Sequence, residues 1–400
     1  MKRYDVIVVG GGPVGSHVAG KLAAWGHKVV VLEQKADIGE PVCCTGIISR
    51  ECVNYLTLDE SVILRCLNSG RLISPAGKEI RLWRPETQAC VIDRPAFNLL
   101  MAKRAQDRGA EYLMGSRVTD VQVMADRVIA AAGRQGKSLD IEARVAVVAT
   151  GFGSSLAGRL GLGKVGDFAA GAQAEVDANV DEVEVYFGRE AAPGFFAWLV
   201  PTRPGKALVG LLSRHSPGLY LRRLVALLVA QGKVVSTPSE IKYRGVSLKP
   251  PPRTYGDRLV VVGDAAGQVK PTTGGGIYYG VLCADIAADS LHRALENDDL
   301  SARSLASYER AWQKRLGWEL KMGYWARRFY ERLSDAQVNR LFDIIMRQGI
   351  DVALLKAEEL SFDWHGRVIL RLIRRRVLSA GMEMVTAPLR LGRRNLTKVE

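Results

Sequence analysis

The chain has 400 residues, 48% hydrophobic and 24% charged, which is typical of a globular protein with more than one compact domain. No apolar run reaches the roughly eighteen residues that a membrane-spanning helix needs, and we expect no signal peptide. The formal net charge is +14, and residues 301–400 carry 20 Lys and Arg against 11 Asp and Glu. Such a basic surface attracts anionic membranes or acidic protein partners. No nucleic-acid-binding motif accompanies the charge, which argues against nucleic acid as a partner.

The six cysteines and five histidines restrict the kinds of site that the chain can form. Many cysteines in a large chain without a signal peptide indicate a reducing compartment, so we expect a cytoplasmic location. The cysteines form no Cys-x-x-Cys pair, and the histidines form no set of ligands along the sequence. Four thiolates with the spacing of iron–sulfur ligands are also lacking. The sequence therefore predicts no metal site.

The first 33 residues follow the pattern of a strand, a glycine-rich turn, a helix and a second strand. Residues 4–9 and 28–32 are short β-branched apolar runs, typical of buried parallel strands, and residues 16–25 have helical spacing. The turn has the spacing Gly-x-Gly-x-x-Gly and the second strand ends on an acidic residue: Gly10, Gly12, Gly15 and Glu33.

This pattern predicts a dinucleotide site. Gly10 permits a tight turn, Gly12 lets the backbone approach a pyrophosphate, and Gly15 lets helix and strand pack closely. The start of the helix supplies amide donors and a positive dipole to the phosphates. Glu33 lies where a ribose hydroxyl is bound in such sites.

Two adjacent cysteines follow, in the segment Pro41-Val-Cys-Cys-Thr-Gly46. They are candidates for metal ligands, a redox pair, a reactive thiol beside a cofactor, or small apolar residues of the core. A disulfide between adjacent residues would be strained.

The middle of the chain predicts a second sheet. Gly and Pro interrupt β-like segments over 66–92 and 165–250, and a helix is expected over 219–231. Four aromatic residues in these strands can line an apolar substrate cavity or form an ordinary sheet core: Phe187, Phe195, Phe196 and Trp198. For Phe187 we favour the sheet core.

Beyond this sheet, residues 258–263 form another strand pattern, followed by Asp264 and a helix from about 275 to 295. From residue 300 the spacing is helical, and residues 367–378 form a basic amphipathic segment. That segment either caps the substrate domain, which we favour slightly, or lies on anionic lipid.

The strand ending in Gly263-Asp264 resembles the second flavin motif of glutathione reductase-like and aromatic hydroxylase-like flavoproteins. The resemblance implies that FAD is the cofactor and that Asp264 binds its ribityl chain. It also implies that backbone amides at Gly275, Gly276 and Ile277 meet the pyrimidine edge of the flavin. Asp93-Arg94-Pro-Ala-Phe resembles a segment whose arginine lies beside the flavin, so Arg94 inherits that place.

Two further segments make the chain similar to the geranylgeranyl reductase family. Residues 38–48 resemble its cysteine segment, with Cys44 aligned to the cysteine near the flavin and Cys43 at a variable position. Residues 196–201 resemble its Tyr-x-Trp-x-Phe-Pro motif and keep Trp198 and Pro201, whereas Phe196 replaces the tyrosine.

The resemblance implies reduction of isolated isoprenoid double bonds in a lipid or lipid precursor, with hydride from reduced flavin. Such an alkene is not polarised, so a proton donor is needed. A thiol or an ordered water can supply the proton, and Cys44 is the candidate thiol. For Cys43 we favour a packing role. The substrate-pocket residues implied are Phe196, Trp198 and Pro201. The electron donor is expected to be a ferredoxin-like protein or NAD(P)H.

We therefore predict an α/β fold with a Rossmann-type FAD-binding domain, an inserted antiparallel β-sheet substrate domain and a helical C-terminal region. The expected segments are 1–65, 91–165 and 250–300 for FAD, 66–90 and 166–249 for substrate, and 301–400 for the helices. The protein would be cytoplasmic, with peripheral contact at a membrane surface as a further option.

Competing functions on the same fold are a flavin monooxygenase or halogenase, a quinone-linked dehydrogenase, and a flavin-binding protein without catalysis. Thr150 stands where aromatic hydroxylases usually carry Asp, which argues against a hydroxylase and against direct reduction by a nicotinamide.

Overall fold

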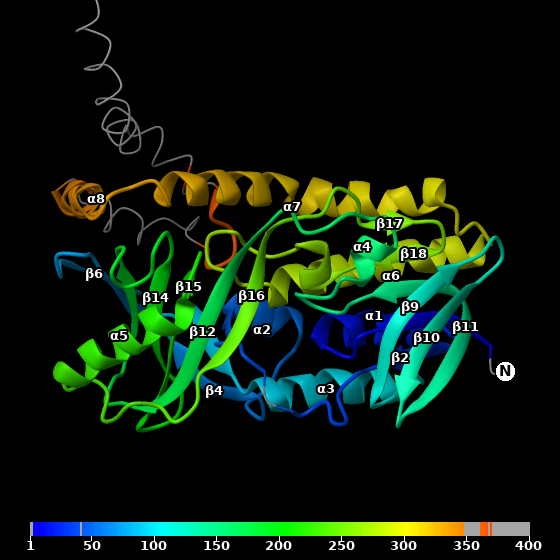
Figure 1. Cartoon of the computed structure of the whole chain (residues 1–400), viewed down its shortest axis with the longest axis horizontal. Coiled ribbons are helices and arrows are strands. Elements are labelled where there is room, and N and C mark those ends of the chain that lie inside the picture. Colours follow the sequence, from blue (N-terminus) through cyan, green and yellow to red (C-terminus); the bar gives the residue numbers. More distant parts are fainter. Residues whose placement is uncertain (1–2, 41, 348–360, 367–368, 370–400) are drawn as a thin grey trace, which may run out of the picture. The chain divides into compact units, whose positions relative to one another are not determined.

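The computed structural model describes residues 3–40, 42–347, 361–366 and 369 of the chain (Figure 1). The chain divides into two compact units, which are described separately below. Unit 1 comprises Met1–Leu64, Cys90–Ala169 and Arg244–Lys321. Unit 2 comprises Arg65–Ala89, Ala170–Tyr243 and the described residues from Met322 onward.

An eight-stranded sheet forms the centre of unit 1, in the order β17-β18-β11-β1-β2-β8, with β10 paired to β11 and β9 paired to β10. The pairs β2–β8, β1–β2, β1–β11 and β11–β18 are parallel, whereas β9, β10 and β11 pair in antiparallel fashion. The bounds are β1 Arg3–Val9, β2 Val29–Leu32, β8 Glu111–Leu113, β9 Ser116–Val123, β10 Val128–Arg134, β11 Lys137–Val148, β17 Tyr255–Gly256 and β18 Leu259–Val261.

The parallel strands are short apolar runs because both faces of the sheet are covered. All four residues of β2 are buried, as are the last four of β1 and of β11. Helix α1 contacts both α3 and α6. The remaining elements that begin in unit 1 are α1 Pro13–Ala24, β3 Ile47–Ser49, α2 Arg50–Tyr55, β4 Ile63–Leu67, α3 Arg94–Gln106, α4 Leu156–Arg159, the 3-10 helix η1 Gly263–Ala266 and α6 Ile277–Glu296. A small sheet has the order β3-β7-β4, where β7 is Ala89–Ile92.

Unit 2 is built on a seven-stranded sheet in the order β16-β12-β15-β14-β13-β5-β6. The pairs β12–β15, β15–β14, β14–β13 and β5–β6 are antiparallel, and β13–β5 is parallel. Helix α5 (Pro217–Ala230) packs against β15. The strand bounds are β5 Ser69–Ile73, β6 Glu79–Trp83, β12 Asp167–Asp177, β13 Val183–Phe187, β14 Phe196–Pro201, β15 Lys206–Ser213 and β16 Lys242–Lys249. The α/β sheet with an inserted, mainly antiparallel sheet agrees with the predicted fold.

The predicted C-terminal helices are α7 (Ala302–Tyr330) and α8 (Asp335–Arg347). The first part of α7 belongs to unit 1, where Leu305, Tyr308, Trp312 and Leu316 are buried. The Tyr308 hydroxyl donates to the Val261 carbonyl of β18 at 2.7 Å. Helix α7 is therefore part of the packing of the parallel sheet.

In unit 2, helix α8 covers β5 and β6 through an apolar cluster. Ile80 of β6 is buried together with Val338 and Phe342 of α8, and Phe187 packs against the same cluster. The expectation that Phe187 belongs to a sheet core is thereby confirmed. Among the described helices, none combines the length and hydropathy that crossing a membrane requires. The basic segment predicted over 367–378 lies outside the described residues apart from Ile369.

Candidate functional site

The glycine-rich turn after β1 is closely packed at two of its glycines and open at the third. Gly10 has φ +108°, and a Cβ there would lie 2.5 Å from the Ala149 carbonyl oxygen. A Cβ on Gly15 would lie 2.0 Å from the Gly10 oxygen. At Gly12, by contrast, a Cβ would meet no atom within 4 Å, and no side chain caps this end of α1. The turn thus leaves space and uncapped amide donors where an anionic group can bind.

Glu33, at the end of β2, is buried and holds the glycine turn in place. Its Oε2 atom accepts a hydrogen bond from the Gly11 amide at 2.7 Å, and its Oε1 atom accepts one from the Lys35 amide at 2.9 Å. Each carboxylate oxygen has a second lone pair, so Glu33 can also accept from a ligand hydroxyl.

The second motif meets the first although 250 residues separate them in the sequence. A Cβ on Gly263 would lie 3.2 Å from the Cγ1 atom of Val14 in α1. A Cβ on Gly280 would lie 2.6 Å from the Cγ2 atom of the same valine. These two glycines therefore let η1 and α6 approach α1. Asp264 in η1 lies against the start of α6, because a Cβ on Gly276 would be 2.6 Å from its Oδ1 atom.

Helix α6 begins at Ile277 with Gly276 as its N-cap, two residues later than the sequence pattern suggested, and no side chain caps it. The preceding loop is closed by the Lys270 amide, which donates to the Gly275 oxygen at 3.0 Å, and by the Gly274 amide, which donates to Lys270. Lys270 is 5% exposed, and its Cε atom lies 2.8 Å from the Cβ position of Gly275. Sequence analysis missed this buried lysine, because among Gly, Gln, Pro and Thr residues it looks like a solvated loop residue.

Arg94 is the first residue of α3, and its neighbour Asp93 caps the helix by accepting from the Ala96 amide at 3.1 Å. The Nε and Nη1 atoms of Arg94 are buried and have no hydrogen-bond partner among the described residues. The same holds for the Thr150 hydroxyl, next to the glycine turn. Buried polar groups normally have partners, since leaving one unsatisfied costs about 1–3 kcal/mol. These atoms fit a polar ligand such as the predicted flavin cofactor.

The cysteine segment lies beside Arg94. A Cβ on Gly46, which has φ +74°, would be 3.4 Å from the Arg94 Cγ atom and 2.6 Å from the Ile92 oxygen. Cys43 and Cys44 are partly buried, and within the described chain neither forms a disulfide. The segment thus brings a thiol-bearing loop next to the buried guanidinium.

Arg244 connects this loop with the second motif, a connection that sequence analysis missed because no motif surrounds this arginine. Its Nη2 atom donates to Asp264 Oδ2 at 3.1 Å and lies 3.4 Å from the Cβ position of Gly151. Burial lowers the pKa of Arg244, but Asp264, Cys44 and Cys43 together raise this pKa by more, so it lies above its usual value. The guanidinium is therefore a positive charge fixed by Asp264 and within electrostatic reach of the two cysteines.

In unit 2 the three predicted pocket residues do not share one face of β14. Phe196 and Trp198 are two residues apart, so they project from the same face, with ring centroids 5.9 Å apart. Pro201 projects from the opposite face and is buried. The Trp198 ring covers Gly210, its partner on β15, and its Nε1 atom is buried without a partner among the described residues.

Comparison with known proteins identifies the family. A family model described as lycopene cyclase protein matches residues 5–343. A digeranylgeranylglycerophospholipid reductase of Methanocaldococcus jannaschii is 32% identical over 365 residues, which cover 87% of this chain and 93% of the relative. Digeranylgeranylglycerophospholipid reductase 1 of Methanopyrus kandleri is 33% identical over 78% of this chain and 86% of its own length.

Solved structures agree with this assignment. The crystal structure of a geranylgeranyl bacteriochlorophyll reductase-like protein from Thermoplasma acidophilum has a TM-score of 0.83 at 27% identity and covers 93% of this chain and 96% of its own. A triple mutant of the flavin-dependent brominase Bmp2 has a TM-score of 0.72 at 14% identity over 93% of this chain and 99% of its own, a likeness of fold alone. The chain belongs to the geranylgeranyl reductase family of FAD-dependent oxidoreductases.

Proposed function

We propose that this protein binds FAD and reduces isolated carbon–carbon double bonds in the geranylgeranyl chains of a glycerophospholipid. The names of its relatives support this substrate class. The observation that carries the proposal is the pair of buried Arg94 nitrogens, Nε and Nη1, which have no hydrogen-bond partner among the described residues and lie beside the cysteine loop in the unit that holds both glycine motifs.

The residues of unit 1 that would hold the cofactor follow from their chemistry. The uncapped start of α1 at Gly12, framed by Gly10 and Gly15, takes the pyrophosphate, and Glu33 takes a ribose hydroxyl. Asp264, after Gly263, takes the ribityl hydroxyls. The Arg94 guanidinium donates to flavin acceptors, as do the amides at the start of α6, which belong to Gly275, Gly276 and Ile277.

When bound and reduced, FAD supplies the hydride for alkene reduction. Saturation of the double bond also requires one proton on the second carbon. The Cys44 thiol donates this proton, and the thiolate that remains is stabilised by the Arg244 guanidinium until solvent reprotonates it. Cys43, by contrast, serves packing.

An isoprenoid chain needs an apolar surface, and in unit 2 the Phe196 and Trp198 rings offer one on β14. Pro201, on the other face of the strand, supports the strand and does not contact the lipid. For the electron donor we propose an acidic ferredoxin-like protein, because the chain carries a net charge of +14, with NAD(P)H as the alternative. We also propose peripheral association with the membrane that contains the lipid.

The experiment that tests the function is anaerobic. The flavoprotein is reduced with dithionite and mixed with digeranylgeranylglycerophospholipid, and the product is analysed by mass spectrometry. We expect a gain of about two mass units per double bond together with reoxidation of the flavin. Reoxidation by oxygen or a quinone analogue, with the lipid mass unchanged, would instead assign one of the competing functions. Reduced ferredoxin and NADPH, compared as donors, identify the physiological reductant.

Replacing Arg94 with methionine should weaken FAD binding by about 10- to 100-fold, because a charge-assisted hydrogen bond contributes about 1.5–3 kcal/mol. The same change should leave the apoprotein at least as stable, because the buried Nε and Nη1 atoms have no described partner to lose. The FAD dissociation constant and the free energy of unfolding of the apoprotein are measured in parallel.

Arg104 provides a matched control on the same helix, since its guanidinium donates to the Leu56 and Thr57 carbonyls at 2.6 and 2.9 Å. Arg104→Met should lower the stability of the apoprotein and leave FAD affinity unchanged. Equal FAD affinity of the Arg94→Met variant and the parent protein would remove Arg94 from the cofactor site.

A further inference from the structure

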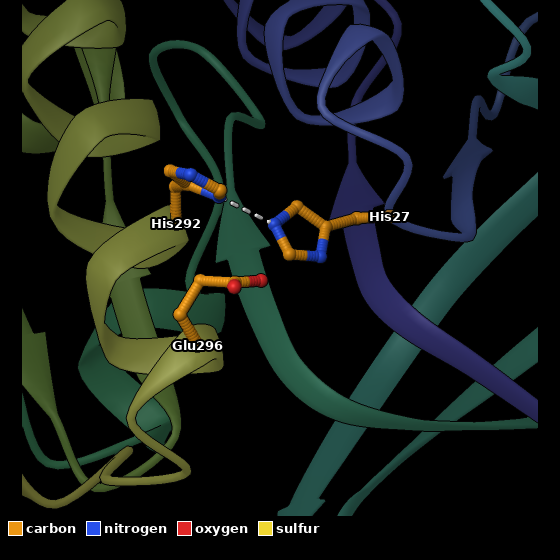
Figure 2. Close-up of side chains that lie close together, drawn as sticks. All are labelled: His27, His292 and Glu296. Atoms are coloured by element: carbon orange, nitrogen blue, oxygen red, sulfur yellow. Dashed lines mark hydrogen bonds between the residues drawn. The ribbon is translucent and has the colours of Figure 1, made fainter.

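Three potential metal ligands gather at the end of unit 1 that lies opposite the glycine motifs. His27 lies in the turn between α1 and β2, at the amino-terminal end of that strand. His292 and Glu296 lie one turn apart at the end of α6 (Figure 2). His292 follows Ile277 by 15 residues, which places it about 22 Å along the helix from the end that faces the flavin motifs. The cluster is therefore separate from the cofactor site.

The ligand atoms of the three side chains all lie within 4.8 Å of one another. The Nε2 atom of His27 and the Nδ1 atom of His292 are 2.9 Å apart, in a hydrogen bond to which one ring contributes a bare nitrogen. Figure 2 shows the Glu296 carboxylate turned toward the His27 ring. Two imidazole nitrogens and one carboxylate oxygen are the protein ligands of a four-coordinate zinc site with one position left for water.

Only a small movement of the two histidine rings would admit the ion. Zinc–nitrogen bonds of about 2.0–2.1 Å at a tetrahedral angle hold two nitrogens about 3.3 Å apart. The histidine nitrogens would have to separate by about 0.4 Å from their present distance of 2.9 Å. In the ring that now donates, the proton would move to the other nitrogen. Zinc binding therefore changes the tautomer of that ring and releases no proton from the pair.

Neighbouring residues hold the two rings in place. The Trp25 ring stacks on His292, with centroids 4.7 Å apart and planes inclined by 29°. The backbone turns at Gly26, which has φ +86°, and the His27 amide donates to the Leu22 carbonyl at 3.2 Å. Both histidines are partly buried, whereas Glu296 is exposed. The nitrogen ligands are thus largely preorganised, and the carboxylate can adjust.

Charges of both signs surround the cluster. The carbonyl end of α6 carries the negative end of the helix dipole. Asp5 and Glu296 lie near His27, but Asp5 is already paired with the Arg144 guanidinium at 3.5 Å. The Arg144 guanidinium is engaged by the Leu295 carbonyl at 3.0 Å and by Asp298 at 2.7 Å. The carbonyl end of α6 and the Glu296 carboxylate are thus the groups that favour a cation at this place.

We propose that His27, His292 and Glu296 form a binding site for a divalent cation of the zinc class, with water as the fourth ligand. The bound ion joins the α1–β2 turn to the end of α6 and so fastens the first strands of the sheet to the long helix. This proposal does not depend on the reductase activity. It also departs from the sequence-based expectation of no metal site, which considered only ligands close together in the chain.

The test uses the full chain without a polyhistidine tag, freed of metal with a chelator and then titrated with zinc against a chromophoric competitor. We expect one equivalent of zinc to bind with a dissociation constant in the micromolar range or below, and the melting temperature to rise. Cobalt should give the visible absorption of a four-coordinate nitrogen and oxygen site. Binding weaker than millimolar, or cobalt spectra of a six-coordinate ion, would overturn the proposal.

Variants assign the ligands. His292→Ala should weaken zinc binding at least 100-fold, whereas His215→Ala, in unit 2, should leave it unchanged. Glu296→Gln changes an exposed side chain without loss of volume and cannot prevent folding, and we expect it to weaken zinc binding about tenfold. Zinc affinity that is unchanged in both the His292→Ala and the Glu296→Gln proteins would show that the ion binds elsewhere.

Discussion

Gly12→Ala is expected to weaken FAD binding by about 10- to 100-fold while leaving the apoprotein folded and equally stable. In the structure a Cβ at this position meets no atom within 4 Å and the backbone has φ −67°, so alanine fits without strain. A pyrophosphate bound at the start of α1 would meet that methyl group, and overpacking of a close contact costs about 1–3 kcal/mol. Titration of the apoprotein with FAD, followed by fluorescence, measures the effect.

A second glycine provides the control for this experiment. Gly133 in β10 also has no atom within 4 Å of its Cβ position, so Gly133→Ala should change neither FAD affinity nor stability. Gly15→Ala is unsuitable because its methyl group would lie 2.0 Å from a backbone oxygen in the protein itself. If Gly12→Ala and Gly133→Ala bind FAD equally well, the pyrophosphate does not lie over the glycine turn.

Cys44→Ala should lower the rate of alkene reduction by about 100- to 10,000-fold, the usual contribution of a general acid. FAD affinity and the flavin spectrum should stay close to those of the parent protein, because the thiol is proposed to act on the substrate. The rate of flavin reoxidation after anaerobic mixing with lipid, in a single turnover, separates this step from reduction of the flavin.

The neighbouring thiol is the matched control for Cys44, since both are partly buried and both feel the charge of Arg244. Cys43→Ala should keep most of the activity. Arg244→Met, which leaves both thiols in place, should slow proton donation and thereby the single-turnover rate. A Cys44→Ala protein that reduces the lipid at the parental rate would show that another group or an ordered water delivers the proton.

The parts of the fold that sequence analysis predicted best are those with a local cause. The first strand, the glycine turn and the second strand each depend on neighbouring residues, and the structure has them at the expected places. In the second sheet, β13 (Val183–Phe187) lies within the β-like segment expected over 165–250, because alternation and flanking turns define it. The helix over 219–231 begins two residues earlier, since Pro217 fits the first turn of a helix.

The site was harder to predict, because several of its residues have meaning only through partners far away in the chain. Arg244 is an ordinary strand residue until the fold brings Asp264 and the cysteine loop to its guanidinium. Lys270 looks like a solvated loop residue, and its burial depends on the packing around α6. Hydrophobic periodicity and glycine spacing carry no information on such contacts.

The hydrogen bonds that join α7 to η1 determine how much chain a minimal cofactor-binding fragment must contain. Gln268 accepts from the Gly263 amide at 2.7 Å and donates to the Tyr308 hydroxyl at 2.7 Å, and Tyr308 in turn donates to Val261. A polypeptide cut at residue 300, where the sheet itself is complete, would lose Tyr308 and leave Gln268 with an unsatisfied amide beside the second flavin motif. Protein engineers who wish to transplant or shorten this domain must therefore retain the chain to about Lys321.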